Sequence, residues 1–95
     1  MVDTGYPVIH QPDAQRFILV EEDATAELNY RLANGVLTIT HIGVPRSLER
    51  RGIGSALAQA GLDYARQQGL AVVPLCWFAR SYIDRTPEYQ SLVRQ

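Results

Sequence analysis

ERRGIGSAL, residues 49–57, is the stretch that decides the fold, because a β-type pattern ends before it and a long helical pattern begins within it. Two glycines, Gly52 and Gly54, stand one residue apart at the start of that helix, directly after Arg50 and Arg51. Glycine tolerates positive φ and lets a ligand approach the backbone closely. The first N–H groups of a helix have no intrahelical acceptor, and the helix dipole favours negative charge there. A strand, a glycine-rich turn and a helix N-terminus together predict a phosphate-binding site.

The helix itself is predicted over residues 52–68, and Gly69 suits its C-terminal cap. Its large apolar residues recur at the spacing of one buried face: Ile53, Leu57, Ala60 and Tyr64. The polar residues are expected on the solvent side: Ser55, Gln59, Asp63, Arg66 and Gln67. The apolar run 70–75 that follows predicts a buried strand. Its Pro74 indicates an edge strand, a bulge or a strand that splays from its neighbour.

Upstream of the glycines, the alternation of apolar and polar residues predicts strands over 15–21, 24–32 and 35–44. Asn34-Gly35 is a typical two-residue hairpin turn between the last two strands. A further short strand over residues 8–10 is a weaker prediction, and residues 46–51 are expected to form a polar loop. These strands should form an antiparallel meander.

Downstream, two short helices are predicted over residues 77–85 and 87–93, with Thr86 as the N-cap of the second. Strand 35–44, helix 52–68 and strand 70–75 make a right-handed crossover, so the two strands should be parallel. The expected fold is therefore α/β with a mixed sheet: a meander, a parallel βαβ crossover and two short C-terminal helices.

Length and composition limit the class of protein. The 95 residues predict a single domain over residues 1–95. The net charge of −1 argues against a protein that binds nucleic acid by neutralising phosphates. The single cysteine excludes an intramolecular disulfide, and His10 and His41 are too far apart to form a metal-binding motif. Without a signal peptide or a membrane-length apolar run, we expect a cytoplasmic protein that does not associate with a membrane.

Three kinds of phosphate-bearing ligand could explain the glycine turn: a dinucleotide, the nucleotide of a P-loop protein, and coenzyme A. A dinucleotide fingerprint requires a third glycine where Leu57 stands, and a P-loop requires a lysine, which the sequence does not contain. Coenzyme A, whose pyrophosphate would bind at the turn, is the third candidate ligand. It is favoured by a resemblance that extends over residues 40–89.

This segment resembles the GNAT superfamily of N-acetyltransferases, and in particular its very short, single-domain members. The matching motifs follow one another at suitable spacing: Val44-Pro45, RGIGS at 51–55, LDYA at 62–65, VVPLC at 72–76, Tyr82-Ile83 and PEY at 87–89. The resemblance implies acetyl-CoA as co-substrate, with the loop amides on the pyrophosphate. It also implies that the pantetheine arm pairs between the splayed strands 35–44 and 70–75. The residues implied in cofactor binding are Val44, Arg50, Arg51, Gly52, Ile53, Gly54 and Ser55.

The resemblance further implies direct attack of an amine on the thioester, with the Val44 backbone N–H polarising the carbonyl. Tyr82 is the expected proton donor to the CoA thiolate. Cys76 either lines the acetyl pocket or forms an acetyl-cysteine intermediate. His41 is a candidate general base, because histidine is the residue type that most often exchanges protons near neutral pH. Short relatives often carry a glutamate where this chain has Gly43.

The acceptor is expected to be an amine on a small molecule or a polypeptide. The wall that longer superfamily members build around the acceptor is missing here, so the site suits a polypeptide or completion by a second copy of the chain. Because the glutamate is absent at Gly43, a coenzyme A or acyl-CoA binding module without catalysis is the alternative function.

Overall fold

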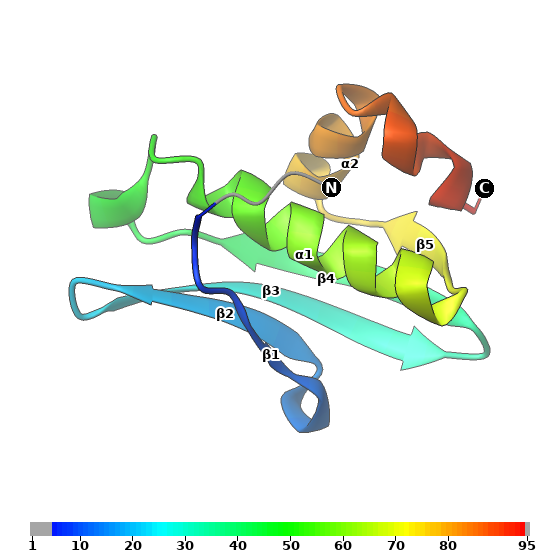
Figure 1. Cartoon of the computed structure of the whole chain (residues 1–95), viewed down its shortest axis with the longest axis horizontal. Helices are drawn as coiled ribbons and strands as arrows, with labels where there is room; N and C mark the ends of the chain where they lie inside the picture. The colour runs from blue at the N-terminus through cyan, green and yellow to red at the C-terminus, as the bar shows by residue number, and fades with distance from the viewer. Residues whose placement is uncertain (1–4, 95) are drawn as a thin grey trace.

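Five strands form one sheet in the order β1-β2-β3-β4-β5 (Figure 1). The computed structural model describes residues 5–94. The strands are β1 (Ile9–Gln11), β2 (Arg16–Glu21), β3 (Ala24–Ala33), β4 (Val36–Gly43) and β5 (Ala71–Pro74). The α-helices are α1 (Ile53–Gln68) and α2 (Trp77–Asp84), and the 3₁₀ helices are η1 (Pro12–Ala14), η2 (Arg46–Leu48) and η3 (Pro87–Leu92).

The pairing confirms the predicted mixed sheet. β1 to β4 are antiparallel neighbours, and β4 pairs with β5 in parallel through the crossover helix α1. The weaker prediction of a strand over residues 8–10 is confirmed one residue later, as β1. Asn34 and Gly35 have φ values of 53° and 77°, which is the left-handed geometry that a two-residue hairpin turn requires.

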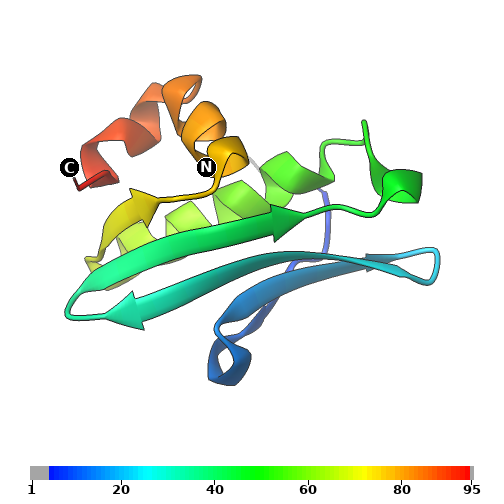
Figure 2. The same cartoon turned by 180° about the vertical axis from the view of Figure 1, so that it is seen from behind.

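Helix α1 covers one face of the sheet (Figure 1). On β3, the alternate residues Ala26, Leu28 and Tyr30 are buried beneath it. A Cβ added to Gly61 of α1 would lie 3.2 Å from Leu28 Cδ1, so this glycine lets the helix approach the sheet closely. Figure 2 shows the opposite face, which no helix among residues 5–94 covers.

The pairing between β4 and β5 ends before β4 does. Pairing stops where Pro74 lies opposite Ile39, and the N–H groups of Leu75 and Cys76 both donate to the Ile39 carbonyl, at 3.0 and 3.3 Å. β4 continues to Gly43, so its last four residues extend beyond the end of β5. β5 is also the last strand of the sheet, which confirms that Pro74 marks an edge that splays from its neighbour.

A β-bulge changes the orientation of β4 at the same place. The register with β3 shifts between Asn29 and Tyr30, so that Tyr30 lies opposite Ile39 but Asn29 lies opposite His41. Ile39 is buried before the shift, and Ile42 packs against the core after it. A bulge places one extra residue on a strand and so turns the following side chains to the other face.

Two local expectations need correction. The segment 46–51 is not simply a polar loop, because η2 buries Leu48. The short helix predicted over residues 87–93 is confirmed as the 3₁₀ helix η3, with Thr86 at its N-cap position. The Thr86 side chain does not cap it, however, because its hydroxyl donates instead to the Tyr82 carbonyl at the end of α2, at 2.7 Å.

Asp63 was also expected to face solvent, and it is buried because η3 folds over α1. The Tyr89 hydroxyl donates to Asp63 Oδ1 at 2.8 Å. Arg66 supports the pair, since its guanidinium lies 3.8 Å from Asp63 Oδ1 and 4.8 Å from the Tyr89 ring centre. This cluster fastens the C-terminal segment to the helix that carries the glycine turn.

We expect Tyr89→Phe to lower the free energy of unfolding by about 1–3 kcal/mol, because a buried acceptor loses its donor. Burial, reinforced by the hydrogen bond to Asp63, raises the pKa of Tyr89. A group whose pKa is raised on folding stabilises the fold below its unfolded pKa, which for tyrosine is about 10. That stabilisation is lost as the pH rises further. Urea unfolding from pH 7 to 11 should therefore show a shallower alkaline loss in the variant.

Tyr64→Phe, on the helix that carries Asp63, is the matched control. Its ring packs against His10 and Phe17, and phenylalanine retains that packing. Equal losses in the two variants would contradict a special role for the Asp63 pair.

Candidate functional site

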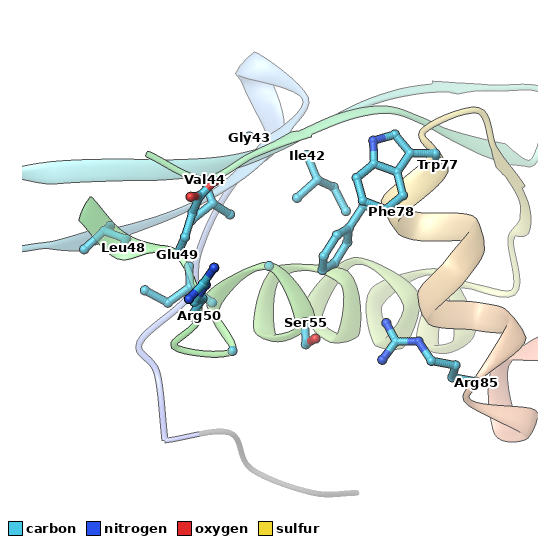
Figure 3. Close-up of a pocket in the computed structure, with 13 residues that line it drawn as sticks. Ile42, Gly43, Val44, Leu48, Glu49, Arg50, Ser55, Trp77, Phe78 and Arg85 are labelled. Carbon is cyan, nitrogen blue, oxygen red and sulfur yellow. The ribbon is translucent and has the colours of Figure 1, made fainter. Parts of the chain in front are cut away.

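A cavity of about 670 Å³ lies between the end of β4, the N-terminus of α1 and helix α2 (Figure 3). Its walls come from three segments of the chain. The lining residues are Ile42, Gly43, Val44, Leu48, Glu49, Arg50, Gly52, Ile53, Gly54, Ser55, Trp77, Phe78 and Arg85. The end of β4, which pairs with β3 but extends beyond β5, and the glycine turn therefore border the same space.

The glycine turn exposes the N-terminus of α1 to this cavity. Gly52 is the N-cap residue in left-handed conformation (φ 78°), and no side chain caps the helix there. A Cβ added to Gly52 would meet nothing within 4 Å, so the backbone conformation and not space requires glycine. The first turn carries no acidic residue, so the positive end of the helix dipole is not neutralised from within α1. N–H groups in this position can donate to an anion.

Gly54 has a different reason to be glycine. A Cβ added to it would lie 2.8 Å from Cζ of Phe78. From the sequence we expected a ligand to approach the backbone at Gly54. In the structure the Phe78 ring of α2 approaches it instead, and this ring itself lines the cavity (Figure 3). Gly54 thus sets how near α2 comes to the first turn of α1.

Six of the seven residues predicted to bind the cofactor line the cavity: Val44, Arg50, Gly52, Ile53, Gly54 and Ser55. Arg51 is not among the lining residues. Its guanidinium pairs with Glu22 at 2.6 Å, and its carbonyl accepts a hydrogen bond from the Tyr6 hydroxyl. The hydrogen bond to Glu22 raises the pKa of Arg51. The pair joins the glycine turn to the hairpin between β2 and β3.

The three catalytic candidates are not among the residues that line the cavity. Tyr82 is on α2, one turn after Phe78, with its ring centre 6.1 Å from that of Tyr89. Burial raises the pKa of Tyr82. Cys76 is half-buried at the N-cap of α2, where the chain leaves β5. His41 is exposed on β4, on the face of the sheet away from α1.

Arg85 was missed by the sequence analysis. It follows Phe78 by seven residues, which is two turns and hence the same face of the helix, and that spacing was the available signal. Figure 3 shows its guanidinium on the side of α2 toward Ser55. Arg85 and Arg50 thus bring two cations to the cavity, with Glu49 as the opposing charge.

No helix within residues 5–94 is long and apolar enough to cross a membrane. In the same part of the chain, no group of three histidine, cysteine or acidic side chains is arranged to hold a metal ion.

Comparison with known proteins identifies relatives of this chain. The family model described as GCN5-related N-acetyl-transferase matches residues 16–92. Protein NATD1 of Mus musculus is 32% identical over 59 residues, which are 62% of this chain and 54% of that protein. Its Homo sapiens counterpart is 32% identical over the same length, at 52% of that protein. The chain therefore spans about half the length of the curated relatives it matches.

A solved structure supports the fold. The NMR solution structure of a GCN5-like candidate N-acetyltransferase from Staphylococcus aureus superposes with a TM-score of 0.74 at 27% sequence identity. The match covers 94% of this chain and 88% of that chain.

Proposed function

The chain belongs to the GCN5-related N-acetyltransferase family, and on that premise we propose that it transfers the acetyl group of acetyl-CoA to an amine. One observation carries the proposal. The uncapped N-terminus of α1 and the part of β4 that extends beyond β5 border a single cavity of about 670 Å³. A phosphate-binding helix end and an open strand edge are what a ligand with a pyrophosphate and an amide-containing arm would use.

In this proposal, different residues of the cavity bind different parts of coenzyme A. The N–H groups of residues 53–55 donate to the pyrophosphate of coenzyme A, and Arg50 and Arg85 supply charge-assisted contacts to phosphate. Residues 42–44 offer their backbone groups to the pantetheine arm, as an added strand would use them. Trp77 and Phe78 offer aromatic surface to the ligand on the far wall.

The chemistry follows a direct attack. The amine adds to the thioester carbonyl, whose developing charge is stabilised by the backbone N–H of Val44. Tyr82 is the proposed donor of the proton that the thiolate takes up. A tyrosine hydroxyl, whose ordinary pKa is about 10, is protonated at neutral pH and so carries the proton that this role requires. Cys76 borders the acetyl end, since its N–H donates to the last β4 carbonyl paired with β5.

The experiment is a thiol-release assay with acetyl-CoA and a panel of amines and lysine-containing peptides, with the products identified by mass spectrometry. We expect amine-dependent release of thiol, and about a tenfold lower kcat in Tyr82→Phe with unchanged affinity for CoA. Tight CoA binding without turnover on any acceptor would favour the non-catalytic binding module instead. An acetyl label on Cys76 would indicate the covalent route.

The acceptor site is proposed to be open. Within residues 5–94 no helix covers the sheet face opposite α1 (Figure 2), so a polypeptide or a second copy of this chain has access there.

A further inference from the structure

The imidazole of His41 occupies the space that a side chain at Gly43 would fill. A Cβ added to Gly43 would lie 2.8 Å from Nε2 of His41, 3.5 Å from its Cδ2 and 3.7 Å from its Cε1. Real Cβ atoms essentially never approach another atom to 2.8 Å. His41 can therefore hold this position only because residue 43 is glycine.

We call the position of the His41 imidazole beside Gly43 its seat, and Gly43 connects this seat with the cavity. Gly43 is one of the lining residues, and its neighbours Ile42 and Val44 line the cavity and pack against the core. His41 reaches the back of this wall because the bulge turns it to the face away from α1. The last residues of β4 also extend beyond β5, so no strand closes the slot beside them. His41 Nε2 thus lies beside Gly43, a residue that lines the cavity, on the face of β4 away from α1.

The other charged groups near this seat are already engaged. On this face β3 presents Glu27 opposite Gly43 and Asn29 opposite His41, with Arg31 further along. β2 presents Arg16, which lies 3.7 Å from the Glu27 carboxylate and donates to Gln11 at 2.6 Å. Because Glu27 pairs with Arg16, the imidazole is the group best placed to accept a proton at the slot.

We propose that Gly43 is a positioning residue that seats His41 as the proton acceptor of the reaction, and that the amine approaches from the open sheet face. This inference rests on the proposed acetyl transfer. The amine lone pair forms the C–N bond with the thioester carbon, and the C–S bond breaks with its electron pair moving to sulfur. The surplus proton on nitrogen goes to His41 Nε2, and the CoA thiolate takes its proton from the Tyr82 hydroxyl.

Gly43→Ala tests the seat directly. The added methyl meets only the movable end of a side chain, and Gly43 is not in left-handed conformation, so the variant should fold. We expect kcat to fall about tenfold in Gly43→Ala and about 100-fold in His41→Ala, as for loss of a general base, with CoA affinity kept. The double variant should be no slower than His41→Ala alone. Added imidazole should restore part of the activity of His41→Ala.

Independent losses that add in the double variant, or full activity in either single variant, would overturn the proposal. A readout without turnover separates it from the proposed function. In Gly43→Ala the displaced ring should react faster with diethyl pyrocarbonate, measured by mass spectrometry. His10, which stacks on Phe17 and shares a hydrogen bond with the Tyr30 hydroxyl, is the internal reference and should react at its wild-type rate. An unchanged rate at His41 would refute the seat, whereas absence of CoA binding in the wild type would refute the acetyl transfer itself.

Discussion

Gly54→Glu is expected to raise the Kd for coenzyme A by about 100-fold or more. The substitution places a carboxylate on the first turn of α1, where the phosphate is proposed to bind. Two like charges about 4 Å apart repel by about 1 kcal/mol in water and about 4 kcal/mol near a protein surface, and about 2.7 kcal/mol corresponds to a hundredfold change in Kd. The side chain must also displace Phe78, which leaves no room at Gly54. Isothermal titration calorimetry measures the loss.

Gly54→Gln is the matched control, because it adds nearly the same bulk without the charge. We expect it to bind more tightly than Gly54→Glu, and circular dichroism should show that both variants fold. If Gly54→Glu folds and binds CoA as the wild type does, the phosphate does not lie at this helix end.

Leu57→Ala is expected to lower the free energy of unfolding by about 3 kcal/mol. Leu57 is completely buried on α1, where deletion of its branched end leaves a cavity beneath the sheet-facing side of the helix. Small domains are stable by only about 5–15 kcal/mol, so this is a large share of the total. Urea unfolding at pH 7 gives the value.

Leu32→Ala provides the comparison, since the same atoms are removed from a side chain that is 41% exposed. We expect a loss below about 1 kcal/mol there, because much of that surface already meets water. Similar losses at both positions would mean that α1 is not the centre of the core.

Local signals were enough to predict the fold. The alternation along β3, the Asn34-Gly35 turn and the helical spacing of Leu57 each depend on neighbours in sequence, and each is confirmed. Pro74 was informative for the same reason, because a missing N–H restricts where a strand can pair. The wrong expectation for Asp63 arose from a partner, Tyr89, that lies 26 residues away.

The site was predictable only in part. The glycine turn could be recognised by its residue types and their spacing. The pairing of Arg51 with Glu22 could not, because Glu22 lies 29 residues earlier and only the folded chain brings the two together. The bulge in β4 has no clear signature in the residues around Thr40, although it decides which face His41 occupies. The position of His41 beside Gly43 depends on that bulge, so the sequence alone did not predict it.

The central claim is that coenzyme A binds between the N-terminus of α1 and the open end of β4. A titration of CoA into the ¹⁵N-labelled protein, followed by two-dimensional NMR, tests it most directly. We predict that the amide signals of residues 42–44 and 52–55 shift together with one Kd, while those of β1 stay in place. Shifts confined to the small cavity of about 220 Å³ lined by Pro74, Arg80 and Gln90, or no shifts at all, would contradict it.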